Sequence, residues 1–315
     1  MIQYACVPNT SRNTAGAESG PSGPSVSAAE GSEPVSRHDD EVTERLRALL
    51  ERFGFRPLST RSQLLSLLLG THPPEMSVER LVAFGDIVGI RPGTVRTTLS
   101  RMVAAGDLAT DDARYRLSDR LLARQRQQDL DRTDAVTPDR PDASVPAWTG
   151  GWWTAVVVAD DRSMTERRRF RSSMVGARMG ELRPDIWMRP DNLAPPTAEG
   201  VIVTRGPLVQ GDPRRLVDEL WDVATLESSA TELAGAFDEL REVFVADPRR
   251  RLPIAFDVSA VVVNFLRREP RLPVELVDLS ACSALRSAYA DFNVTFLDEL
   301  SVMLGGDRAS LRRSP

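Results

Sequence analysis

Apolar residues recur every three or four positions in four successive stretches between residues 39 and 106. Such spacing gathers the apolar side chains on one face of a helix. The alternating segment LATDDARYRL follows and predicts two short strands joined by an Asp-Asp turn. Helix, helix, helix and hairpin is the order of a winged helix-turn-helix. We place that motif between about Leu64 and Leu117, with a further helix in front of it. The four predicted helical stretches are 39–53, 60–70, 77–90 and 91–106.

Capping residues support two of these helices. Thr60 is placed to cap the start of the second stretch, and Gly70 closes it. The fourth stretch begins at Arg91-Pro92. Proline is acceptable there because the N–H groups of the first helical turn have no helical partners, so the missing N–H of proline costs no hydrogen bond. Gly106 ends it, since glycine readily adopts a left-handed conformation.

The pattern changes after Leu117. Residues 118–147 begin as a polar helix and turn into a Pro- and Asp-rich linker, which indicates a domain boundary. The segments WWTAVVVAD, DIWMRP and GVIVTRG are typical of strands, and MTERRRFRSSMVGARMG is typical of a helix. This order predicts a small α+β sandwich of ferredoxin-like kind. From Pro213 onward helical periodicity dominates.

We therefore predict an α+β multi-domain protein. It begins with a winged helix-turn-helix, continues with a central ferredoxin-like α/β sandwich and ends with a helical domain for effector binding and dimerisation. The residues before 39 are rich in Ser, Gly, Pro, Ala and Glu, so they bury too little apolar surface to fold. The predicted parts are a disordered tail at 1–38, the DNA-binding domain with its leading helix at 39–126, a linker at 127–147, the central domain at 148–212, the helical domain at 213–300 and a tail at 301–315.

The composition, with 41% hydrophobic and 27% charged residues, is that of a soluble globular protein. No apolar run approaches the roughly 20 residues that span a bilayer, and the first ten residues do not resemble a secretory signal. We therefore expect a cytoplasmic protein with no membrane partner. Cys6 and Cys282 lie far apart, and His38 and His72 are the only histidines. We predict no metal site, no cofactor and no catalytic residues.

The local distribution of charge favours nucleic-acid binding, although the whole chain carries a net charge of -5. All 40 basic residues are arginine. Residues 91–126 contain eight arginines and four aspartates, so this stretch has a net charge of 8 - 4 = +4 in an acidic protein. A concentrated basic surface of this kind favours DNA binding.

The helix predicted at 91–106 has one apolar and one polar face. Val95, Leu99 and Met102 form a single stripe toward the core. The opposite face carries small, hydroxylated or cationic residues, so the helix can enter a major groove about 12 Å wide. The alternative is a solvated surface helix with ordinary polar residues. The candidate DNA-binding residues of this helix are Arg91, Thr94, Arg96, Thr97, Ser100 and Arg101, with Thr94 and Thr97 expected nearest the bases.

The predicted hairpin adds two further candidates. Alternation directs Tyr115 and Leu117 inward, and Arg114 and Arg116 outward. The two arginines are placed to contact the phosphate backbone or to enter a minor groove.

Five segments resemble, in their order along the chain, the PaaX-like family of phenylacetic-acid-pathway repressors: VRTTLSRMVAAGDL, WTGGWWTAVVV, LRPDIWMRP, LVDELWDVATL and FLRREPRLPVELV. The resemblance spans about residues 60–295. It implies a winged helix-turn-helix, a central domain similar to the Cas2 proteins and a helical C-terminal domain. It also implies a homodimer that represses transcription at a double-stranded DNA operator and is released by an acyl-CoA, phenylacetyl-CoA in the type case.

Three alternatives stay open at this point. One predicted helix carries Arg167, Arg168 and Arg171. These arginines form a solvated basic face, a second DNA contact or a contact to the phosphates of a CoA-like effector. Asp160-Asp161 follows the first central strand, where Cas2-type nucleases hold a metal, so a metal-dependent nuclease is the alternative function. The helix-turn-helix is alternatively a protein-interaction module.

Overall fold

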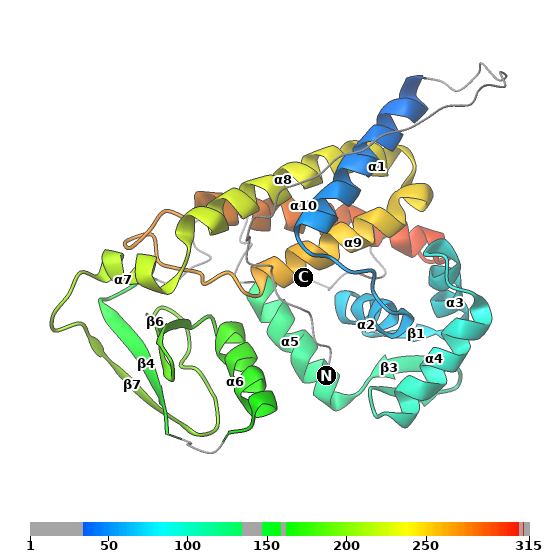
Figure 1. Ribbon diagram of the computed structural model, residues 1–315. Helices are drawn as coiled ribbons and strands as arrows, with labels where there is room; N and C mark the ends of the chain where they lie inside the picture. Colours follow the sequence, from blue (N-terminus) through cyan, green and yellow to red (C-terminus); the bar gives the residue numbers. More distant parts are fainter. Residues whose placement is uncertain (1–33, 134–146, 159–161, 309–310, 312–315) are drawn as a thin grey trace, which may run out of the picture.

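The computed structural model describes residues 34–133, 147–158, 162–308 and 311. These residues form a mixed α+β protein with ten helices and two antiparallel sheets (Figure 1). The smaller sheet and three helices form one end of the molecule, the larger sheet forms another, and long helices join them. Residues 1–33 of the predicted tail lie outside the described residues, whereas residues 34–38, which we predicted to be disordered, begin the first helix.

Helix α1 (Pro34–Arg52) packs on the C-terminal helices α8 and α9, whereas we assigned it to the DNA-binding domain from its position in the chain. Its buried stripe contains Val42, Leu46, Leu49 and Leu50. Ion pairs from Arg45 to Glu239 and from Arg52 to Glu232 attach it to α8. An apolar stripe indicates that a helix face is buried, but it does not indicate against which helix.

The predicted helices and hairpin between residues 60 and 117 are present. Helix α2 is capped by Ser59, whose hydroxyl accepts a hydrogen bond from the Ser62 amide, so Thr60 is the first helical residue rather than the cap. Strand β1 was not predicted, because three residues are too few to show alternation. It makes the sheet three-stranded, in the order β1-β3-β2. The elements are α2 (Thr60–Gly70), β1 (Glu75–Ser77), α3 (Val78–Ile87), α4 (Pro92–Ala104), β2 (Leu108–Asp111) and β3 (Arg114–Leu117).

Helix α5 (Asp119–Thr133) runs from the hairpin toward the centre of the molecule (Figure 1). It extends into the segment predicted as a linker from residue 127, while residues 134–146 lie outside the described part. The Gln125 side-chain amide is buried and donates to the carbonyl groups of Leu68, Leu69 and Thr71, at 3.3, 3.2 and 3.0 Å. These bonds occupy carbonyl groups at the end of α2, which have no helical partners, and fix α5 to that end.

The larger sheet has four antiparallel strands in the order β5-β6-β4-β7. Strand β5 was not predicted, because it follows the helix as a short GELR segment. Helix α6 lies on one face of the sheet, where Met174, Ala155 and Trp187 form a small separate core (Figure 1). The connection at 191–200, which the structure describes throughout, contains no helix. The elements are β4 (Gly151–Val157), α6 (Met164–Gly176), β5 (Gly180–Arg183), β6 (Ile186–Pro190) and β7 (Val201–Pro207).

Four helices complete the chain and confirm the helical periodicity after Pro213. Aromatic rings of α8 and α10 pack together in the core, with the Phe237 and Phe292 centroids 5.2 Å apart. The principal core is continuous from α1–α5 into these helices. Leu311 is buried, and its carbonyl accepts the His72 amide, so part of the predicted tail at 301–315 is docked. No helix in the described ranges is long and apolar enough to cross a membrane. The helices are α7 (Pro213–Leu220), α8 (Val223–Ala246), α9 (Pro248–Leu266) and α10 (Ser280–Met303).

Candidate nucleic-acid interface

Helix α4 lies at the outer side of the molecule (Figure 1), with its apolar face buried and its other face exposed. Arg91 is its N-cap and Pro92 its first residue, as predicted. Val95, Leu99 and Met102 are at most 1% exposed, so the predicted stripe is the buried one. The side chains opposite this stripe therefore belong to the protein surface.

Gly85 of α3 makes the close approach between α3 and α4 possible. A Cβ atom at this position would lie 2.5 Å from Cγ2 of Val95. Two carbon atoms cannot lie that close, so one of them must move. The clash involves Val95, the first residue of the buried stripe of α4. The orientation of α4 thus depends on the absence of a side chain in α3.

We expect Gly85→Ala to lower the free energy of unfolding by about 1–3 kcal/mol, the usual cost of overpacking a core. Urea titration measures this effect. Gly93→Ala is the matched control: nothing lies within 4 Å of its added Cβ, so it should leave stability unchanged or raise it. Equal stability of the two variants would contradict the packing argument.

The structure places all eight candidate residues on the exposed surface of α4 and of the β2–β3 hairpin. The hairpin turn has positive φ at Asp112 (42°) and Ala113 (60°), which turns the chain back so that β3, with Arg114 and Arg116, pairs with β2. Tyr115 is half-buried and Leu117 buried, in agreement with the predicted alternation. The exposed residues are Arg91, Thr94, Arg96, Thr97, Ser100, Arg101, Arg114 and Arg116.

Two of the hydroxyl groups are engaged with the helix itself. Thr97 Oγ1 donates to the Gly93 carbonyl at 2.9 Å, and Ser100 Oγ donates to the Arg96 carbonyl at 3.2 Å. In this state each hydroxyl hydrogen is already donated, but each oxygen still has lone pairs that can accept a hydrogen bond. These groups can accept from a base amino group directly, and they must rotate before they donate to a phosphate.

The arginines of this surface differ in how much of their charge is available. Arg91, Arg96, Arg101 and Arg116 form no ion pair with a carboxylate in the described ranges. Arg114 pairs with Glu75 at 2.8 Å, so its charge is partly balanced within the sheet. A hydrogen bond with Ser77 and, more weakly, the charge of Arg96 lower the pKa of Glu79.

Sequence reasoning missed an arginine that organises this region. Arg61 of α2 reaches the carboxylate of Asp107 through Nε at 3.1 Å, and Arg120 of α5 reaches the other oxygen at 2.8 Å. Asp107 is buried, with 3% of its side chain exposed. The three residues join α2, the end of α4 and α5. Arg120 contributed to the local charge count, but it is bound to an internal carboxylate.

The arginines proposed to contact an effector phosphate lie elsewhere. Arg167, Arg168 and Arg171 are exposed on α6, whose N-terminus has a capping box formed by Ser163 and Glu166. Arg171 forms an ion pair with Glu181, and its guanidinium lies 5.6 Å from the Trp187 ring. Their proposed role stays a prediction. Asp160 and Asp161 lie outside the described residues.

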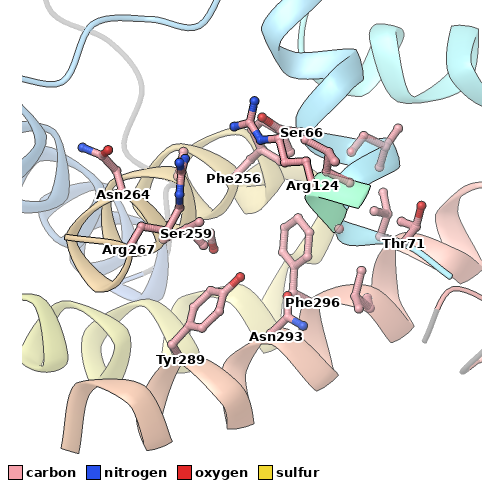
Figure 2. Close-up of a pocket in the computed structure, with 17 residues that line it drawn as sticks. Ser66, Thr71, Arg124, Phe256, Ser259, Asn264, Arg267, Tyr289, Asn293 and Phe296 are labelled. Carbon is pink, nitrogen blue, oxygen red and sulfur yellow. The ribbon is translucent and has the colours of Figure 1, made fainter. Parts of the chain in front are cut away.

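A cavity between the helices was not predicted. Residues of α2, α5, α9 and α10 line a partly open cavity with a volume of about 120 Å³ (Figure 2). No sequence motif could indicate it, because its walls come from four segments far apart in the chain. Cys282, on α10, is completely buried and outside this cavity, and burial raises the pKa of its thiol.

Comparison with known proteins agrees with this arrangement. The family model described as PaaX-like protein matches residues 59–121, which run from the cap of α2 to the start of α5. A solved structure of the uncharacterized protein Rv0674 from Mycobacterium tuberculosis is similar, with 33% sequence identity and a TM-score of 0.60. The match covers 78% of this chain and 99% of that one. No match was found among curated proteins.

The fold and its exposed arginines define a mixed α+β protein with a basic helix-and-hairpin surface. The chain belongs to the PaaX-like family. This membership is consistent with a regulator, the class that its sequence resembles.

Proposed function

We propose that this protein is a DNA-binding transcriptional regulator, a binding protein rather than an enzyme. One observation carries the proposal: α4 buries its apolar face and exposes Thr94, Thr97, Arg96 and Arg101 together, with no described carboxylate paired to either arginine. Small hydroxylated residues and arginines can contact phosphates and base edges in a major groove.

In this proposal residues 60–117 form a winged helix-turn-helix. Helix α4 is the recognition helix, α3 is the helix before it, and β2 and β3 form the wing. The β5-β6-β4-β7 order supports a ferredoxin-like central domain in which a loop replaces the second helix. The division into a DNA-binding, a central and a helical domain belongs to the same proposal.

We further propose a homodimer on an operator with twofold symmetry. Two α4 helices would then enter successive major grooves, about 34 to 36 Å apart. The family resemblance supports repression of a catabolic operon in the cytoplasm and release by an acyl-CoA or a related catabolite. Selection of genomic fragments bound by the protein would identify the operator and the pathway.

Salt dependence tests DNA binding before the operator is known. If four arginines of each protomer contact phosphates, the bound dimer makes about eight such contacts. Its affinity for duplex DNA should then fall by about 10,000-fold between about 50 and 200 mM salt, because each contact releases bound counterions. Fluorescence anisotropy with a labelled random duplex measures this. A protein-interaction module would show no DNA binding at low salt, and that result would overturn the proposal.

A further inference from the structure

The cavity between α2, α5, α9 and α10 has an apolar interior with polar groups at its margins. Its lining includes aliphatic and aromatic side chains from every helix except α5. Phe296 and Tyr289 point from α10 into the space between the helices (Figure 2). Pockets of this composition suit a compact apolar body that carries one or a few polar atoms.

The charge of the lining selects the sign of the ligand. None of the seventeen lining residues is acidic, whereas Arg124 and Arg267 are cationic. Arg267 is half-buried on α9 and forms no ion pair with a carboxylate in the ranges that the structure describes. Asn264 and Asn293 add amide groups that can donate hydrogen bonds. An anionic group is the natural partner for this set.

A second observation points to a ligand. Thr71, at the end of α2, is completely buried and lines the cavity. Its hydroxyl oxygen Oγ1 has no hydrogen-bond partner among the described residues. Leaving a buried hydroxyl unsatisfied costs about 1–3 kcal/mol, so a polar ligand atom or a water molecule is expected beside it.

The size of the cavity limits the ligand. Its volume of about 120 Å³ is close to the roughly 150 Å³ of cavities that accept a benzene ring. A ring or a short branched chain with one carboxylate fits this volume.

We propose that this cavity binds a small monocarboxylate with an aromatic or branched aliphatic body, and that the acid is an effector of the regulator. The second part rests on the proposed function. The acid's carboxylate faces Arg267, and its body packs on Phe296 and the leucines of α2. Helices α2 and α5 adjoin the candidate DNA-binding surface, whereas α9 and α10 belong to the C-terminal helices. A bound acid that contacts both pairs of helices therefore favours one position of the first pair relative to the second.

Binding is tested on the full chain with benzoate as the probe and benzamide as its neutral counterpart. Thermal unfolding should shift upward with millimolar benzoate, since a ligand that binds the folded state stabilises it by mass action. Benzamide should bind at least about tenfold more weakly, because it lacks the charge. No shift with benzoate, or equal shifts with both compounds, would overturn the site.

One variant locates the binding. Arg267→Gln should weaken benzoate binding by about tenfold or more, as the loss of a charge-assisted hydrogen bond. Arg268→Gln is the matched control, an adjacent half-buried arginine outside the lining, and it should bind benzoate as the unmodified protein does. If the two variants bind benzoate equally, the acid binds elsewhere. The comparison of benzoate with benzamide needs no variant, so it decides the proposal even if Arg267→Gln does not fold.

The effector role has its own measurement. DNA affinity should change at least about fivefold when the protein is saturated with benzoate, the lower range of allosteric couplings. DNA binding that is unaffected by bound benzoate would overturn the effector role and leave DNA binding standing. An absence of DNA binding together with normal benzoate binding would overturn the proposed function and leave the cavity as a binding site.

Discussion

Replacing Arg96 and Arg101 together by alanine is expected to abolish operator binding without disturbing the fold. Both side chains are exposed on α4, and neither is paired with a carboxylate in the described ranges. Their removal therefore breaks no ion pair among the described residues. Each lost phosphate or guanine contact weakens binding by about tenfold or more, so affinity should fall at least about 100-fold. If both arginines contact phosphates, the dimer loses two contacts in each protomer, so the salt slope should also fall by about 4.

A mobility-shift titration with the selected operator measures this loss. Arg215→Ala with Arg241→Ala is the matched control, because both residues are exposed helical arginines on α7 and α8, outside the candidate surface. It removes the same net charge, so it accounts for long-range electrostatics. Undiminished binding by the Arg96/Arg101 variant, or equal losses in the two variants, would show that α4 is not the recognition helix.

Replacing Glu269 by alanine is expected to lower the free energy of unfolding by about 3–5 kcal/mol, the cost of leaving buried charges without their counterion. Glu269 is 1% exposed and pairs with Arg286 at 2.7 Å. It also lies 3.8 Å from Arg178, which comes from the turn after α6. Both arginines are nearly buried, with 7% of each side chain exposed. The carboxylate therefore stabilises the contact between the larger sheet and the C-terminal helices.

Chemical denaturation followed by circular dichroism measures this effect. Glu219→Ala is the control, since it removes an exposed carboxylate that pairs with Arg215. Such surface pairs contribute about 0–1 kcal/mol. If Glu269→Ala were no more destabilising than Glu219→Ala, the buried cluster would not hold the two parts of the molecule together.

The candidate DNA-binding surface could be predicted because its signals are local. The bounds of α2 follow the pattern of TRSQLLSLLLG, and the stripe of Val95, Leu99 and Met102 is the buried face of α4. Helical periodicity, a proline at the start and a glycine at the end act within a few residues of one another. Exposure of the opposite face follows from burial of this one.

The remaining features depend on contacts between distant segments. The pairing of Asp107 with Arg61 crosses 46 positions, and that of Glu269 with Arg178 crosses 91. The cavity walls extend from Ser66 to Leu300. A periodic pattern carries no information on which helix meets which, so neither the charge pairs nor the cavity could be read from the chain.

The amino-acid order by itself determined the helices and the strands other than the short β1 and β5, and which face of α4 is polar, because these depend on neighbours within one or two turns. The tertiary structure alone decided that α1 packs on α8 and α9, and that Arg120 is bound to Asp107 rather than available to DNA. It also decided that Arg267 and Thr71 line one cavity. Burial and charge pairing depend on proximity in space, and proximity between distant segments exists only once the chain has folded.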